Sequence, residues 1–483
     1  MPDRRRWLVL GVLGFGNFMA ALDLFIVNVA IPSIHRQLHA SDAQTEFVVT
    51  AYSLTYALLL ITGGRLGDLV GGKRMFMGGM ALFTVSSLLC GLAPSPSVLI
   101  GARVLQACGA AAMLPQVFST MQRVFSPRER VVCIALLTSA SSLAVISGQL
   151  VGGALIQADL FGLGWRVVFL VNLPIGAFAL LVAALVLHDV PSEGRGRLDL
   201  GGVALVTVAL LLLTVPLVEG REAGWPWWMG LLLVLSPLAF ALFVAHENRV
   251  AQAGRAPLLH LALFRERSFS AGIGIVVLNH IGNAGLFFVL AVFLQSGRGF
   301  APESAGLVFA PIGAGYVLGA TLAPRLLRRI GQSVITAGYL TVACGAAITL
   351  VRIRTAGVSL DVVQLIPCVA VIGFGQGLVN SPLFATLLSR VRPGQEGSAA
   401  GVMTTAQQVG SALGVAVLGL VYFSALDAAH GVAWGRADEA ITFALLVNVA
   451  IGVIGATAVR ALPRDATAFS SAARVAESAV SEA

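Results

Sequence analysis

A short polar turn, Gly64-Arg65-Leu66-Gly67-Asp68-Leu69-Val70-Gly71-Gly72-Lys73-Arg74, separates two long apolar runs. The run before it, Phe47–Ile61, and the run after it, Met75–Leu92, are each long enough to form most of a membrane span. The glycines of the turn allow the backbone to bend sharply, and Lys73 and Arg74 are typical of a cytoplasmic loop. An ordinary basic connector would look similar, so the turn alone indicates a membrane hairpin and no function.

The composition extends this conclusion to the whole chain. Of 483 residues, 57% are hydrophobic and 11% are charged, and the mean hydropathy is +0.89. Soluble domains carry roughly 25% charged residues, so we predict an all-α polytopic membrane protein. The net charge of +8 does not indicate nucleic-acid binding, because the charges separate apolar runs instead of forming one patch. Five cysteines lie in apolar runs without metal-ligand spacing, which predicts free thiols.

Fourteen apolar runs have the length of a membrane span. The first one follows three arginines, but it is too long for the apolar core of a signal peptide, so we expect an uncleaved span. The predicted spans are Trp7–Ile31, Phe47–Gly64, Met75–Leu92, Val98–Met121, Val131–Ile156, Val167–Leu187, Leu200–Val218, Trp225–Ala245, Ala271–Leu294, Ala305–Ala323, Val334–Val351, Val362–Leu388, Ala399–Tyr422 and Ile441–Val459.

Charge placement predicts the orientation. If the N-terminus is cytoplasmic, 23 of the 31 lysines and arginines fall in cytoplasmic segments, 7 fall outside and Arg103 lies within a span. This asymmetry agrees with the positive-inside rule, so both termini are expected in the cytoplasm. Only one of these 31 residues is a lysine. Our hypothesis is that the chain comes from a bacterium with a GC-rich genome.

Two charged residues lie deep within spans. Asp23 lies roughly 12 Å and Arg103 roughly 8 Å from the outer ends of their helices at 1.5 Å per residue, so the two could pair. Intramembrane acids are usually functional, which makes Asp23 a candidate proton carrier and anchor for a cationic substrate. Alternatively, Asp23 bonds to the backbone or to Asn28, and Arg103 reaches outward to the interface. His280 is a second candidate because histidine titrates near neutrality.

Polar and aromatic residues elsewhere in the spans are candidates for the lining of a substrate cavity. Each one alone could equally form a hydrogen bond between helices. The candidates are Asn28, Tyr52, Tyr56, Gln106, Asn279, Asn283, Phe287, Gln376, Asn380 and Gln407.

The opening stretch resembles the signature loop of the major facilitator superfamily, Gly-x-Leu-x-Asp-x-x-Gly followed by basic residues. In that family the loop latches the cytoplasmic side while two halves of the protein rock. The resemblance implies a conformational switch formed by Gly64, Gly67, Asp68, Gly71, Lys73 and Arg74.

Three further stretches resemble the fourteen-span drug:proton antiporter branch of that superfamily. Leu22–Pro32 is similar to its first span and Trp165–Gly176 to its sixth. Arg103-x-x-Gln106 resembles a fourth-span pattern linked to proton coupling. Ser147–Gly153 resembles the antiporter motif of the fifth span, here Gly148, Gln149, Gly152 and Gly153, with Gln149 in the position of a proline.

An internal repeat in the sequence indicates that the chain consists of two similar halves. Arg325–Gly331 can be aligned with Arg65–Gly71, although Arg328 replaces the acid. We therefore expect the major facilitator fold with two inserted helices. The predicted divisions are an N-terminal six-helix bundle at 1–187, an inserted pair with a cytoplasmic linker at 188–269, a C-terminal six-helix bundle at 270–461 and a cytoplasmic tail at 462–483.

The resemblance implies a monomeric antiporter of the bacterial inner membrane that exports amphipathic, cationic drugs, antibiotics or dyes. Its partners would be the small-molecule substrate, protons and lipid, with the proton gradient in place of any cofactor or metal. The sequence has no phosphate-binding loop, zinc motif or nucleophile elbow, so no enzyme is predicted. The open alternatives are export of an endogenous metabolite or siderophore, uptake, and a non-transporting scaffold or sensor.

Overall fold

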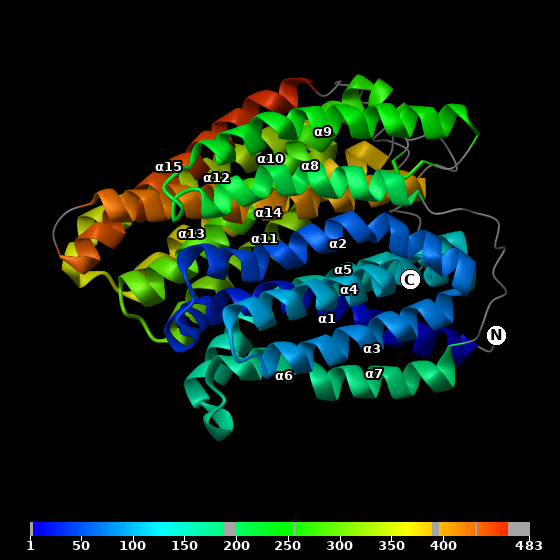
Figure 1. Ribbon diagram of the computed structural model, residues 1–483, viewed down its shortest axis with the longest axis horizontal. Coiled ribbons are helices and arrows are strands. Elements are labelled where there is room, and N and C mark those ends of the chain that lie inside the picture. Colours follow the sequence, from blue (N-terminus) through cyan, green and yellow to red (C-terminus); the bar gives the residue numbers. More distant parts are fainter. Residues whose placement is uncertain are drawn as a thin grey trace. The chain divides into compact units, whose positions relative to one another are not determined.

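The computed structural model describes residues 3–187, 199–254, 257–259, 261–388, 396–429 and 432–461. Within these ranges the chain is helical and has no β-strand (Figure 1). The α-helices are α1 (Asp3–Leu38), α2 (Asp42–Val70), α3 (Gly72–Gly91), α4 (Pro96–Val124), α5 (Pro127–Ala158), α6 (Val167–Leu170), α7 (Asn172–Val186), α8 (Leu200–Glu219), α9 (Trp227–Gln252), α10 (Arg267–Val292), α11 (Pro302–Ile330), α12 (Ser333–Ala356), α13 (Val362–Leu388), α14 (Glu396–Ala428) and α15 (Ala433–Ala458).

The helices confirm the predicted fold class. Thirteen helical segments of the described chain are long and apolar enough to cross a membrane. The predicted fifth span falls on α5, which has 32 residues and includes the apolar stretch Leu143–Ala158. Every predicted span therefore corresponds to a helical segment, and the chain is an all-α polytopic membrane protein.

The predicted sixth span, Val167–Leu187, is interrupted. The short helix α6 ends at Leu170, and α7 begins at Asn172. Pro174 has no backbone N–H, so it cannot donate the α-helical hydrogen bond to the carbonyl of Leu170. The break lies next to Asn172, a residue of the functional site described below.

The two copies of the internal repeat end their helices in the same way. Gly71 terminates α2 with φ 103°, and Gly331 terminates α11 with φ 58°. Backbone with positive φ is readily adopted by glycine and disfavoured for residues with a Cβ. The aligned glycines of the repeat therefore perform the same local task, although the acid of the first copy is absent from the second.

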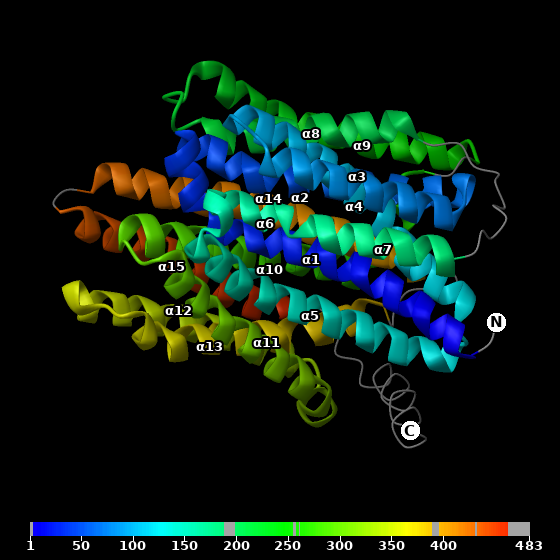
Figure 2. The same cartoon turned by 90° about the horizontal axis from the view of Figure 1, so that it is seen from below.

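The chain divides into two compact units, the first comprising Met1–Gly148 and Ala158–Leu261, the second Gln149–Gln157 and Ala262–Ala483. In the first unit, α4 packs against α2 and α3, while α7 packs against α1 and α3. Figure 2 shows these helices running alongside one another. In the second unit, α13 packs against α11 and α12, and α10 packs against α14. The finer predicted boundaries remain predictions, and residues 462–483 lie outside the described chain.

The inserted pair α8–α9 belongs to the first unit and is attached to α2 near both ends of that helix. Near the start of α2, Arg221 forms an ion pair with Asp42, and the Glu222 carboxylate accepts a hydrogen bond from the Ala43 amide. Near the other end, the Arg65 guanidinium donates to the carbonyl of Pro257, just after α9. The pair α8–α9 therefore contacts both ends of α2, the helix in which the Gly64–Arg74 stretch begins.

Candidate functional site

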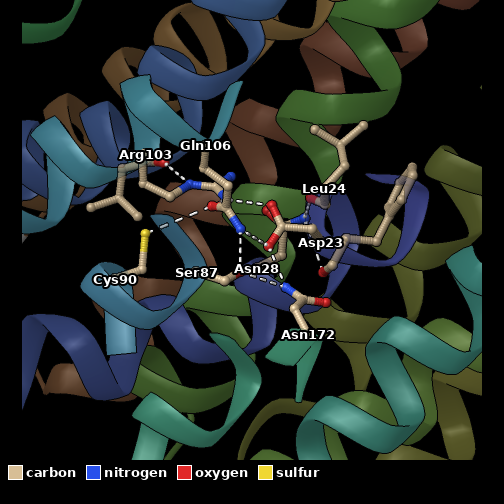
Figure 3. Close-up of polar contacts among 10 residues, drawn as sticks. Asp23, Leu24, Asn28, Ser87, Cys90, Arg103, Gln106 and Asn172 are labelled. Atoms are coloured by element: carbon tan, nitrogen blue, oxygen red, sulfur yellow. Dashed lines mark hydrogen bonds and ion pairs between the residues drawn. The ribbon is translucent and has the colours of Figure 1, made fainter. Parts of the chain in front are cut away.

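The charged centre of the first unit is an ion pair between Asp23 on α1 and Arg103 on α4 (Figure 3). Both side chains have an exposed fraction of 0%. The pairing predicted from their depths is therefore present. Burying two charges is costly unless further hydrogen bonds satisfy them, so the surrounding groups decide what this pair can do.

Arg103 is held by more than the carboxylate. Its Nε donates to the carbonyl of Val48 on α2 at 3.0 Å, and its Nη1 also donates to Oε1 of Gln106 at 2.7 Å. The guanidinium lies over the ring of Tyr52, with Cζ 4.2 Å from the ring centroid. Among the described residues, Nη2 of Arg103 has no hydrogen-bond partner. The two N–H groups of this nitrogen are thus unused.

Asp23 receives two amide donors on its second oxygen. Oδ1 accepts from Nε2 of Gln106 at 2.8 Å and from Nδ2 of Asn172 at 3.1 Å. Both amides also donate to the hydroxyl oxygen of Ser87 on α3, at 2.6 and 2.9 Å. With the guanidinium on Oδ2, the carboxylate accepts donors from two helices, α4 and α7.

The network joins five helices of the first unit. Asp23 comes from α1, Val48 from α2, Ser87 from α3, Arg103 and Gln106 from α4, and Asn172 from α7. Sequence reasoning identified Asp23, Arg103 and Gln106 but missed Ser87 and Asn172. Asn172 falls inside the sixth-span stretch that carries the family resemblance, which is the signal that could have identified it.

Two other predicted cavity residues of the first unit, Tyr56 and Asn28, differ from each other in their contacts. Tyr56 stacks on Tyr52, with ring centroids 6.3 Å apart, next to the charged centre. Asn28 does not bond to Asp23, because its amide donates to the carbonyls of Leu24 and Phe25 on its own helix. The alternative in which Asn28 holds the carboxylate is therefore wrong.

The predicted switch residues form the junction of α2 and α3. Gly67 lies against α4, where an added Cβ would overlap the Gln116 amide. Lys73 donates to the carbonyl of Ala184 on α7 at 3.2 Å. Gly64 and Arg74 lie on the same two helices, and the Asp68 side chain is outside the described structure. The role of this junction as a switch stays a prediction.

The predicted antiporter motif spans the division of α5 between the two units. In the first unit, a Cβ on Gly148 would lie 3.1 Å from the Ile26 amide of α1. In the second unit, a Cβ on Gly153 would lie 2.6 Å from the Pro302 carbonyl at the start of α11. Gly152 is buried, and the Gln149 side chain is buried with no hydrogen-bond partner in the described chain.

Four of the predicted cavity residues meet in the second unit. Asn279 on α10 donates to Asn380 on α13 at 3.1 Å, and Gln376 on α13 donates to Asn283 on α10 at 3.1 Å. Amides can both donate and accept, so this cluster can exchange its internal hydrogen bonds for bonds to a polar ligand.

The remaining candidates of the second unit make other contacts. His280 interacts through Nδ1 with the carbonyl of Val276, one turn earlier on α10, at 2.9 Å. Phe287 stacks on Phe309 with ring centroids 5.3 Å apart. The carbonyl of Gln407 accepts from the Ser411 hydroxyl. Among the described residues, His280 forms no ion pair comparable to that of Asp23 with Arg103.

Comparison with known proteins establishes the family. The sequence profile of the Major Facilitator Superfamily matches residues 13–415. The chain belongs to the Major Facilitator Superfamily. It is accordingly a multi-pass transporter of small molecules and not an enzyme.

Several bacterial relatives cover most of this Major Facilitator Superfamily chain. It is 39% identical over 88% of its length to the "Probable actinorhodin transporter" of Streptomyces coelicolor, covering 74% of that protein. It is 34% identical over 95% of its length to the "Puromycin resistance protein pur8" of Streptomyces alboniger, covering 91% of it. It is 32% identical over 88% of its length to the "Multidrug resistance protein Stp" of Mycobacterium tuberculosis, covering 78% of it.

A solved structure agrees at the level of the fold. A bacterial homologue of the human lysosomal transporter Spinster, in an inward-facing and unoccupied conformation, aligns with a TM-score of 0.69 at 17% identity. The alignment covers 96% of this chain and 98% of that one. This similarity supports the predicted major facilitator fold.

Proposed function

We propose that this protein exports amphipathic, antibiotic-like small molecules across the bacterial cytoplasmic membrane in exchange for protons. The observation that carries the proposal is the buried Asp23–Arg103 pair with its amide and hydroxyl partners. The names of the relatives, which include an actinorhodin transporter and puromycin and multidrug resistance proteins, support the substrate class.

The pair suggests how a proton could drive exchange. In the arrangement observed, Asp23 is held as a carboxylate by Arg103, Gln106 and Asn172. A proton on Asp23 would remove the charge that holds the guanidinium, leaving Arg103 with its Val48 and Gln106 acceptors. A cationic substrate that approached Asp23 would compete with Arg103 in the same way. A proton and a cationic substrate would therefore exclude each other from Asp23, which is the requirement for exchange of one for the other.

Export of a metabolite that the cell itself makes is the second candidate. It is favoured by the similarity to the "Probable actinorhodin transporter" and to the "Cephamycin export protein CmcT" of Amycolatopsis lactamdurans, which is 35% identical over 83% of this chain. Both candidates use the same coupling site and differ only in the natural substrate, so a panel of antibiotics tested as substrates would discriminate between them.

The test is substrate movement into inverted membrane vesicles under an imposed pH gradient. Asp23→Asn keeps the shape and one acceptor but cannot titrate, so we expect gradient-driven transport to be abolished, while Asp23→Glu retains part of it. Exchange of one substrate molecule for another needs no proton and should persist in Asp23→Asn.

Asp361→Asn, which alters an exposed carboxyl, serves as the matched control and should transport like the unmodified protein. Full gradient-driven transport by Asp23→Asn, at equal amounts in the membrane, would refute the proposed role of Asp23. His280→Asn would then be the next variant to test.

A further inference from the structure

A second cluster of titratable groups lies where α8 begins and α9 ends, apart from the Asp23 site. It consists of Asp199, His246 and Glu247, whose nearest nitrogen and oxygen atoms all lie within 4.8 Å of one another. The Glu247 side chain has an exposed fraction of 0%, and the Asp199 side chain one of 8%. Buried acids in such proximity require compensation.

One oxygen of each carboxyl group is satisfied by the protein. Oδ1 of Asp199 accepts from the Gly202 amide at 2.9 Å and contacts Nε2 of His246 at 2.8 Å. Oε2 of Glu247 accepts from the Leu259 amide at 2.7 Å. These bonds fix the orientation of both carboxyl groups.

The other oxygen of each carboxyl group has no donor among the described residues. Oδ2 of Asp199 and Oε1 of Glu247 are buried and have no hydrogen-bond donor within the described part of the chain. Both lie next to Gly202, where an added Cβ would approach each of them closely. Two carboxylates in one site cannot readily both be ionised. A proton between these oxygens would convert the repulsion into a hydrogen bond.

The surrounding charges indicate which group carries the proton. Burial alone would raise the pKa of Asp199, but the His246 and Gly202 hydrogen bonds hold it below its usual value, so Asp199 is the ionised member. From α2, Arg65 interacts electrostatically with both acids. The described residues of the segment 257–259 carry no charged side chain. His246 is the most exposed member of the cluster at 32%, which gives the site access to water.

We propose that Asp199 and Glu247 share one exchangeable proton and form a proton-binding site separate from Asp23. His246 connects this site to water, and Arg65 connects it to α2. The inference rests on the proposed function only for its consequence in transport, because proton binding itself is measured without substrate.

The experiment counts protons taken up by the purified full-length protein when the pH falls from about 8.5 to about 5.5, a range above the ordinary pKa of glutamate. We expect Glu247→Gln to take up one proton fewer per chain, since glutamine cannot titrate. The same loss is expected in an Asp23→Asn background, which separates this site from the coupling site. Asp199→Asn, which keeps the capping oxygen of α8, should show the same loss if Glu247→Gln does not fold.

Two further variants sharpen the test. Glu219→Gln, which alters an exposed acid at the other end of α8, should leave the uptake unchanged. Arg65→Gln removes the facing cation and should move the uptake to higher pH. Equal proton uptake by the unmodified protein and Glu247→Gln would overturn the proposal. So would proton release on addition of Mn²⁺ or Zn²⁺ alone that is absent in Glu247→Gln, because the pair would then be a metal site.

Discussion

At the scale of the residue, the protein is organised by the compensation of one buried charge pair. Asp23 would be unfavourable in the membrane by itself, and the guanidinium of Arg103 alone leaves one of its oxygens unsatisfied. Gln106 and Asn172 supply that oxygen with two donors, and Ser87 orients both amides. The buried Asp23 carboxyl group is thus compensated by neutral neighbours as well as by the cation.

Asn172→Ala tests this compensation. Removal of one donor to the carboxylate favours the protonated form. A hydrogen bond to a charged group contributes about 1.5–3 kcal/mol, so the loss of this one should be large enough to measure. We therefore expect the pH of half-maximal gradient-driven transport to move upward in this variant.

Asn28→Ala is the matched control for that prediction, because the Asn28 amide bonds only to carbonyls of its own helix. It should leave the pH profile unchanged. A profile of Asn172→Ala that coincides with that of Asn28→Ala would show that Asn172 does not influence Asp23.

At the scale of the element, α3 and α4 are brought together by glycines. A Cβ on Gly109 of α4 would lie 2.6 Å from the Phe83 amide, whereas nothing lies within 4 Å of a Cβ on Gly101 of the same helix. We expect Gly109→Ala to lower the free energy of unfolding in detergent by about 1–3 kcal/mol, because the added methyl group overpacks the helix crossing. Gly101→Ala should be neutral or stabilising, because alanine favours helix over glycine. Equal effects of the two substitutions would argue against close packing at this crossing.

The start of α5 is stabilised by a carboxylate cap. Glu129 accepts from the amide and the hydroxyl of Ser126, and these bonds, with Arg6 nearby, lower the pKa of Glu129 although burial opposes the shift. A carboxyl group whose pKa is lowered by folding stabilises the folded state at pH values above its pKa in the unfolded chain. This contribution is lost as the pH falls through its pKa in the folded protein. Glu129→Gln should therefore melt at a lower temperature than the unmodified protein at pH ~7, with the difference disappearing near pH ~3. A difference that persists at low pH would contradict this account.

At the scale of the whole molecule, charge placement predicts the orientation in the membrane. We propose that both termini are cytoplasmic, since this orientation would place 23 basic residues on the cytoplasmic side and 7 on the other. In a protein without its five native cysteines, Trp227→Cys should react with an impermeant maleimide in intact cells. Arg265→Cys should react only after permeabilisation. Both positions are exposed, so the reverse labelling pattern would invert the topology.

Composition and the pattern of apolar runs were enough to predict the class of protein and the positions of its helices. A membrane span requires a minimum length of apolar residues, and that property is local, so each predicted run corresponds to a helical segment. The same holds for the ends of α2 and α11, where Gly71 and Gly331 supply positive φ. The scarcity of charge within spans also identified Asp23 and Arg103 as the pair to consider.

Only the tertiary structure decided which polar groups meet. Ser87 and Asn172 are ordinary residues in apolar runs, and their contacts with Gln106 and Asp23 depend on how α1, α3, α4 and α7 are rotated against one another. Asp199 and Glu247 likewise belong to no motif. Such contacts join positions far apart in the chain, and a hydrogen bond depends on distance and angle, which the spacing of residues along one helix does not determine.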